Sequence, residues 1–179
     1  MDRPVELIPL VCVKCQTPVL AQPEEVAWAC QQCGQGLVLD EEKGLAFLDI
    51  HYAAGIPQGA KGKPCWVAQG TVTLTREIYG GSDRSKDAQA FWLEPRQFII
   101  PAYNCSFEAL LSVSRKFLQQ APRFEEGSPV PFEPVTLSPS DLEKLAIFTI
   151  LAIEADRKDM LKEVNASIHL LSPALWIFP

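Results

Sequence analysis

Four cysteines near the start of the chain have the spacing of metal ligands. They form two pairs, Cys12-x2-Cys15 and Cys30-x2-Cys33, with 14 residues between the pairs. A two-residue gap lets one tight turn point both sulfurs at the same place, and two such turns supply a tetrahedron of thiolates. The sequence therefore predicts a metal site made by Cys12, Cys15, Cys30 and Cys33.

The expected role of this site is structural, and the expected metal is Zn²⁺. Because cysteine fills all four positions, no coordination place is left for water or a substrate. Iron suits the same tetrahedral set of sulfurs and is the alternative metal. Two structural disulfides would require an oxidising compartment, and a thioredoxin-like redox pair would require a βαβ setting. The sequence favours neither of these.

The residues that follow each pair carry a family resemblance. Gly34 and Gly36 follow the second pair and allow the positive φ that turns backbone N–H groups toward the sulfurs. After the first pair, Gln16 stands where a glycine would be usual. On these residues, the segment 7–40 resembles the zinc-ribbon superfamily and, more weakly, rubredoxin. The resemblance implies a short hairpin stabilised by a structural metal.

The charge of this segment argues against nucleic acid, which zinc ribbons often bind. Residues 1–45 carry three basic and seven acidic side chains, a charge of −4, and four thiolates with one Zn²⁺ add −2. The whole chain has a formal charge of −6. Phosphate contacts supply most non-specific affinity for nucleic acid, so an acidic ribbon disfavours it. A nucleic-acid-binding alternative would depend on basic residues around two loops: Lys61, Lys63, Arg76, Arg84 and Lys86.

The remaining cysteines and the two histidines give a second alternative, an enzyme. Cys65, Cys105, His51 and His169 contain no tight pair, so their spacing does not predict a second metal site. Cys105 precedes a predicted helix, whose N-terminus can lower a thiol pKa, and a histidine would serve as its base. Free cysteine is, however, more often buried and inert, and no phosphate loop or serine elbow is present. We expect a protein without catalytic residues.

The rest of the chain alternates between strands and helices. A Gly/Pro/Lys loop, a polar turn and a proline-rich internal linker are predicted at 55–64, 80–88 and 121–139. The predicted strands are a hairpin over 36–53 that turns at Gly44, a strand over 65–79, a strand over 90–103 interrupted by Pro95, and a strand over 167–179. The predicted helices are 106–120 and 138–163, the second with Ser138 as its N-cap and Pro139 in its first position.

Two nine-residue segments, 93–101 and 171–179, share leucine, proline, isoleucine and proline at matching positions, and align Phe98 with Trp176. The match suggests a pseudo-twofold repeat of a kinked strand and a helix. It predicts that Trp176 packs against the 138–163 helix as Phe98 packs against the 106–120 helix.

Together these patterns predict an α+β protein with a zinc ribbon over 1–45, including its exit hairpin, and an α+β domain over 46–179. Apolar residues make up 47% and charged residues 21% of the 179 residues, as in ordinary globular proteins. No signal peptide is apparent, and the longest apolar stretch, 145–155, is shorter than the roughly 20 residues that span a bilayer. We expect no membrane insertion and a cytoplasmic location. The predicted function is a protein–protein interaction or complex-assembly module with a protein partner.

Overall fold

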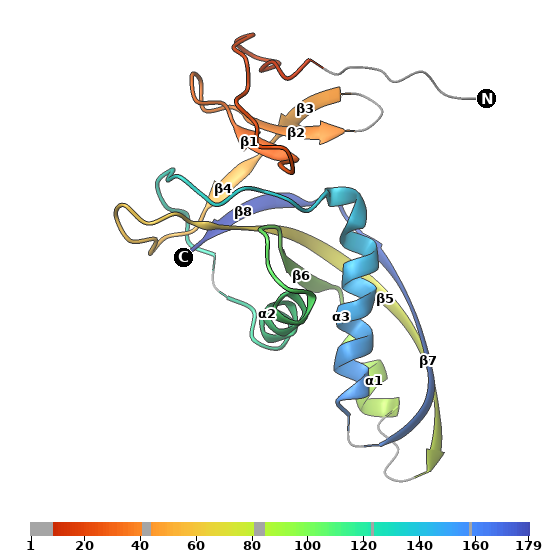
Figure 1. The fold of residues 1–179 in the computed structure, drawn as a ribbon. Helices are drawn as coiled ribbons and strands as arrows, with labels where there is room; N and C mark the ends of the chain where they lie inside the picture. The colour runs from red at the N-terminus through yellow and green to blue at the C-terminus, as the bar shows by residue number, and fades with distance from the viewer. Residues whose placement is uncertain (1–8, 41–43, 81–84, 123, 158) are drawn as a thin grey trace, which may run out of the picture.

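The computed structural model describes residues 9–40, 44–80, 85–122, 124–157 and 159–179. Figure 1 shows a small sheet, a larger curved sheet, and helices that pack against the larger one. The predicted α+β class is therefore confirmed. Within the described ranges, no helix combines the length and the apolar character that a membrane crossing requires.

The small sheet contains three antiparallel strands in chain order: β1 (Ala27–Ala29), β2 (Gly36–Asp40) and β3 (Gly44–Leu48). Strands β2 and β3 form the predicted hairpin, and Gly44 opens β3 with a φ of 80° that suits glycine. Residues 41–43 of the predicted turn lie outside the described residues. Strand β1 pairs with β2, and the second cysteine pair, Cys30 and Cys33, lies in the turn between these two strands.

The larger sheet is organised around the 18-residue strand β5 (Lys63–Gly80). The part of β5 nearest its start lies between β6 (Arg96–Pro101) and β8 (Ala174–Phe178), both antiparallel to it. Beyond β8, the short strand β4 (Ile50–Tyr52) pairs in parallel. The remainder of β5 pairs with β7 (Met160–Leu170), and Figure 1 shows these two strands curving away from the others as an arm.

One predicted helix is confirmed and one strand prediction is partly wrong. Helix α2 (Phe107–Gln119) is capped by the Ser106 side chain, which accepts a hydrogen bond from the Ala109 N–H at 3.2 Å. The strand predicted over 90–103 begins only at β6, and helix α1 (Ser85–Trp92) precedes it. Ala88 and Trp92, four residues apart, bury the same face of α1, which stabilises the helix over the expected extended chain.

The helix predicted over 138–163 is right at its start and wrong at its end. Ser138 accepts a hydrogen bond from the Ser140 N–H at 3.3 Å, at the head of a 3₁₀ turn over Pro139–Asp141. Helix α3 (Leu142–Ala155) then ends, and the chain turns into β7. Pairing of β7 with β5 over most of their length outweighs local helix propensity here.

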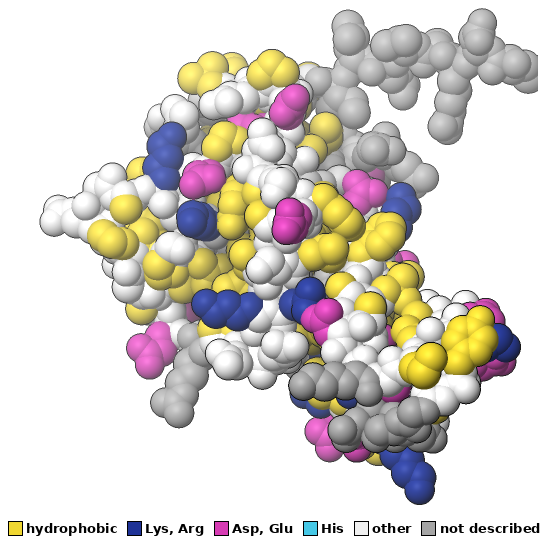
Figure 2. Space-filling view, turned by 60° about the horizontal axis from the view of Figure 1, so that its bottom comes forward, with side chains coloured by type: hydrophobic (Ala, Val, Ile, Leu, Met, Phe, Trp, Pro, Cys, Tyr) yellow, Lys and Arg dark blue, Asp and Glu magenta, His cyan; other side chains and the backbone are white. Residues whose placement is uncertain are grey.

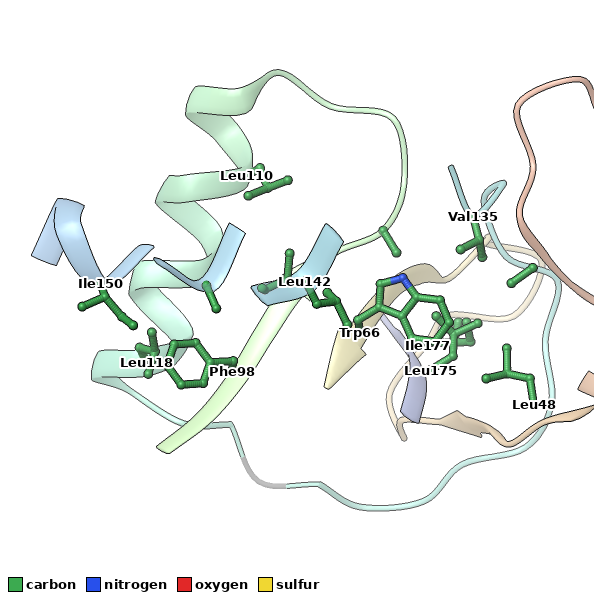
Figure 3. Packing of buried hydrophobic residues seen from close by; sticks show 14 of the residues in the cluster. Leu48, Trp66, Phe98, Leu110, Leu118, Val135, Leu142, Ile150, Leu175 and Ile177 are labelled. Carbon is green, nitrogen blue, oxygen red and sulfur yellow. The ribbon is translucent and has the colours of Figure 1, made fainter. Parts of the chain in front are cut away.

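The main hydrophobic core lies between one face of the larger sheet and the helices. Residues directly opposite in neighbouring strands share a face, so Trp66 of β5 lies with Ile100 of β6 and Leu175 of β8. Figure 3 shows Trp66 and Leu175 of this layer, with Leu142 of α3 near Trp66 and Ile150 of α3 near Phe98. Helix α3 covers this face, and α2 lies along the edge strand β6.

The predicted equivalence of Phe98 and Trp176 is wrong, although β6 and β8 do flank the same stretch of β5. Phe98 lies opposite Ala68 and joins the main core with Leu118 of α2. Trp176 lies opposite Cys65, on the other face of the sheet. Ala68 and Cys65 are an odd number of positions apart on β5, and neighbouring residues of a strand point to opposite faces, so the two aromatic rings lie on different faces of the sheet.

Candidate metal centre

The two cysteine pairs lie on turns with the same backbone hydrogen bonds. In the first, the Gln16 N–H donates to the Cys12 carbonyl at 2.9 Å and the Cys12 N–H donates to Thr17 at 2.9 Å. In the second, the Gly34 N–H donates to the Cys30 carbonyl, and the Cys30 N–H donates to Gln35, each at 2.8 Å. Each turn therefore directs its pair of sulfurs to one side by the same local geometry.

Each turn contains one residue with a left-handed backbone, and in the first turn this residue is Gln16 where glycine would be usual. Gly34 has a φ of 71° and Gln16 a φ of 60°, so Gln16 takes the conformation that glycine adopts without cost. A left-handed backbone costs a non-glycine residue roughly 1–2 kcal/mol. The first turn thus keeps the shape of the second with a less suitable residue.

The four sulfurs converge. The Sγ atoms of Cys12 and Cys33 are 3.7 Å apart and those of Cys15 and Cys30 are 3.6 Å apart, and all four lie within 4.8 Å of one another. A tetrahedral ion with Zn–S bonds of about 2.3 Å separates its sulfurs by roughly 3.8 Å, whereas a disulfide holds them at about 2.05 Å. The spacing fits a metal ion, and the cluster could hold one.

The thiols of the cluster influence one another's ionisation. Hydrogen bonds from the side chain and backbone of Thr17 lower the pKa of Cys15 to about 6. A backbone hydrogen bond from Gln35 acts to lower the pKa of Cys33, but desolvation and the neighbouring sulfurs outweigh it and raise that pKa to about 11. Four adjacent thiols do not all ionise without a cation, and a bound metal ion supplies the charge that deprotonates them.

A small hydrophobic cluster surrounds the sulfurs. Trp28 of β1 is only 6% exposed and packs with Leu37 of β2 and with Cys12 and Cys30. Its indole N–H donates to Glu25 at 2.9 Å. Trp28 therefore belongs to the small hydrophobic core around the cysteine cluster.

The small sheet contacts the rest of the described structure through β1 and β3. The Val26 N–H donates to the Val135 carbonyl at 2.8 Å, and Ala27 pairs with Val135. Ala27 and Leu48 belong to the main core. At Val135, the proline-rich segment thus lies beside the small sheet and is hydrogen-bonded to the chain that enters it.

The structure does not assemble the cysteine–histidine pair of the enzyme alternative. His51 stacks on Trp176 with ring centroids 4.8 Å apart, and His169 lies on β7 opposite Thr71. Among the described residues, no hydrogen bond joins Cys105 to a histidine. Burial, and then the charge of Glu133, raises the pKa of Cys105, which leaves the thiol less reactive than an exposed one.

Arg76 and Lys63, two of the described basic residues of the nucleic-acid alternative, lie in different environments. Arg76 is buried, with a side chain 2% exposed and paired with two acids, while Lys63 lies over the Tyr103 ring. Arg84 lies outside the described residues. Figure 2 shows Lys and Arg side chains interspersed with Asp and Glu on one face of the molecule. That face therefore has no continuous basic patch.

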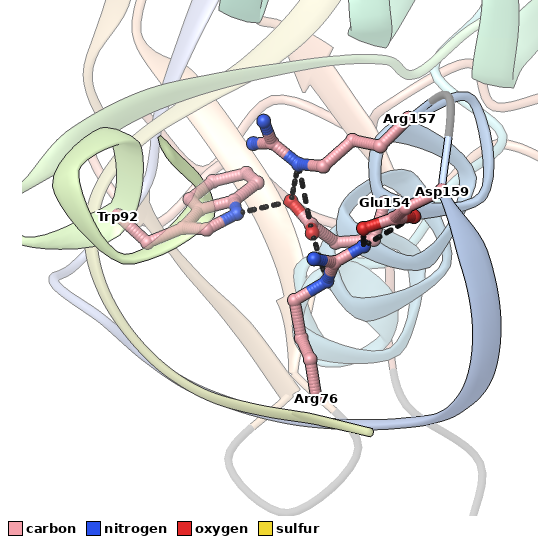
Figure 4. A network of polar contacts seen from close by, with 5 residues as sticks. All are labelled: Arg76, Trp92, Glu154, Arg157 and Asp159. Atoms are coloured by element: carbon pink, nitrogen blue, oxygen red, sulfur yellow. Dashed lines mark hydrogen bonds and ion pairs between the residues drawn. The ribbon is translucent and has the colours of Figure 1, made fainter. Parts of the chain in front are cut away.

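The sequence reading missed a buried polar network, drawn in Figure 4. Glu154 of α3 is fully buried and accepts a hydrogen bond from the Trp92 indole at 2.8 Å. It also pairs with Arg76 of β5 at 2.8 Å and with Arg157 at 2.9 Å. Asp159 pairs with Arg76 at 2.9 Å. The only sequence signal was one acidic residue in an otherwise apolar run, which gives no hint of its partners.

Comparison of the chain with protein-family models, with curated proteins and with solved structures finds no significant match. Assignment of a function therefore depends on the geometry described above.

Proposed function

We propose that Cys12, Cys15, Cys30 and Cys33 bind one Zn²⁺ ion as thiolates. The observation that carries this proposal is the convergence of four sulfurs within 4.8 Å on two matching turns. The bound ion would neutralise two of the four thiolate charges and crosslink the turns before β1 and β2. Iron is the competing metal, since it accepts the same sulfur set.

The metal has a structural role in this proposal. Four protein ligands close the coordination sphere, so no place is left for a substrate. The ribbon's own cluster contains few large side chains, notably Trp28 and Leu37, and a structural metal supplies folding free energy that such a small core lacks. We propose that the ribbon and the α+β body are two folding units with separate sources of stability.

Beyond metal binding, we propose that the protein is a non-enzymatic interaction or assembly module that binds a protein partner, in the cytoplasm. Two observations support a binding role over catalysis: the closed cysteine cluster, and Cys105 without a histidine base among the described residues. The scattered charges and the burial of Arg76 favour a protein partner over nucleic acid.

Metal analysis tests the first part. Freshly purified, reduced protein should contain one zinc per chain by mass spectrometry under native conditions and by elemental analysis. Cys30→Ser should lose the metal, whereas Cys105→Ser, a matched change outside the cluster, should retain it. Iron in place of zinc would correct the metal, and a metal-free wild type would refute the site.

Affinity purification from the native host tests the second part. Proteins that co-purify with the tagged wild type and are lost with Cys30→Ser would support an interaction role that depends on the ribbon. Equal recovery of these proteins with the wild type and with Cys30→Ser would contradict it.

A further inference from the structure

A groove lies between the ribbon and the extended segment that runs past it. It has a volume of about 1060 Å³, above the range of about 300–1,000 Å³ that is usual for small-molecule sites. Leu20, 79% exposed, lies on the ribbon wall, and Pro129, Val130 and Pro131 line the opposite wall. The size and the apolar lining suit a segment of polypeptide better than a small ligand.

The ribbon wall offers unpaired main-chain groups. Strand β1 is the edge of the small sheet, and the Cys30 N–H that follows it donates toward β2, to Gln35. Because successive residues of a strand direct their N–H and C=O groups to opposite sides, those of Ala29 point away from β2. Ala29 lines the groove. Among the described residues, none outside the strand pairings is hydrogen-bonded to its N–H or C=O.

The opposite wall repeats this arrangement. Gly62 donates its N–H to Pro131 and accepts a hydrogen bond from the Glu133 N–H, both at 2.9 Å. Phe132, between these two residues, therefore directs its own N–H and C=O away from Gly62, and it too lines the groove. No other described residue is hydrogen-bonded to those two groups.

The two walls meet where Ala27 pairs with Val135 and separate beyond that point. Main-chain donors and acceptors without partners, next to apolar side chains, are what an added β-strand recognises. Among the described residues that line the walls, one is acidic, Glu25, and one is basic, Lys61, so these residues impose little net charge. A Zn²⁺ ion bound by four thiolates would give the centre that includes Cys30 a charge of −2. This charge would favour a basic residue at that end of a bound peptide.

We propose that this groove binds an extended peptide segment of a partner protein, which adds to the outer edge of β1 at Ala29, beyond the Ala27–Val135 pair, and packs apolar side chains against Leu20 and Val130. The inference rests on the proposed interaction function and assigns it a place and a class of partner.

A library of random twelve-residue peptides displayed on phage, selected on the zinc-loaded full chain, tests the proposal. Selected sequences should alternate apolar side chains, and the synthetic peptides should bind with micromolar affinity. Ala29→Pro removes the outward N–H at a position where an edge strand tolerates proline, and should weaken binding at least tenfold. Leu20→Asp, which alters only an exposed side chain, should weaken it similarly.

The control is Phe47→Pro on β3, the other edge of the same sheet. Phe47 is 64% exposed, and by the alternation along β3 its N–H also points off the edge. This change should alter peptide affinity less than twofold. N-methylation of alternate peptide residues should abolish binding in one register and spare it in the other.

Failure to select any peptide, or equal affinity of selected peptides for wild type and both groove variants, would overturn the proposal. Weaker binding to Phe47→Pro alone would also overturn it, because the site would then lie at β3. Zinc content is measured on every variant. A zinc-loaded chain that selects no groove peptide refutes only this inference, whereas a metal-free wild type refutes the metal site independently.

Discussion

The buried network around Glu154 gives a sharp test of the tertiary structure. Glu154→Gln keeps the shape of the side chain and removes its charge. Arg76, with a side chain only 2% exposed, then loses one of its two carboxylate partners, and its Nη1 atom already lacks a hydrogen bond. Arg157 loses its ion pair with the same carboxylate. The buried group changes from neutral, with two arginines and two acids, to a net positive charge.

The expected cost is large, because removal of one partner leaves an uncompensated buried charge. Such changes cost about 3–5 kcal/mol, a substantial part of the roughly 5–15 kcal/mol that stabilises a typical protein. For a chain of this length the melting temperature should fall by about 6–20 °C, at roughly 2–4 °C for each kcal/mol. The loss of stability comes from the removed charge, because Glu154→Gln leaves the side-chain volume almost unchanged.

Urea denaturation followed by circular dichroism measures this effect. The matched control is Glu143→Gln, the same substitution at an exposed position in the first turn of the same helix, for which we expect a change within about 0.5 kcal/mol. If Glu154→Gln and Glu143→Gln shift the midpoint equally, Glu154 does not lie buried against Arg76 and the placement of α3 against β5 is refuted.

Four further predictions concern the ribbon and the sheet. Gln16→Gly should raise the free energy of unfolding of the metal-bound ribbon by up to about 1 kcal/mol, and Gly34→Ala should lower it by about 1–2 kcal/mol. Resistance of the bound metal to a chelator measures both changes, and changes of the opposite sign would contradict the left-handed turns. Cys12→Ser should unfold the ribbon and leave the helices of the body largely intact by circular dichroism and proteolysis, whereas collapse of the whole chain would show one cooperative unit. Trp176→Ala should lower the free energy of unfolding by about 2–3 kcal/mol, which is less than the 3–5 kcal/mol usual for a core aromatic. The cost is smaller because Trp176 is only partly buried where it packs against neighbouring rings. An unchanged melting curve would contradict this packing. Burial raises the pKa of Cys65 to about 12, so the folded state keeps this thiol protonated. The stability that results is present below pH 9 and is lost as the pH rises from 9 toward 12, where the unfolded chain ionises first. In thermal melts, Cys65→Ala should remove this loss of stability at alkaline pH.

Local sequence was sufficient for features whose contacts are close in the chain. Within each cysteine pair, the two sulfurs point to one side because the turn is closed by hydrogen bonds between residues four or five positions apart, such as Gln16 to Cys12. Helix α2 forms where apolar periodicity follows the Ser106 cap, and β2 and β3 pair although only a few residues separate them in the chain. These features follow from spacing and turn chemistry.

Tertiary structure alone decided the features that depend on distant partners. Arg76 and Asp159 are 83 positions apart, and Trp92 and Glu154 are 62 positions apart, so no local pattern relates them. The end of α3 is set by pairing of β7 with β5, and the opposite faces of Phe98 and Trp176 are set by register against β5. The groove beside β1 arises because segment 129–135 returns to the ribbon. In each case long-range pairing outweighs the weak local preference that a sequence displays.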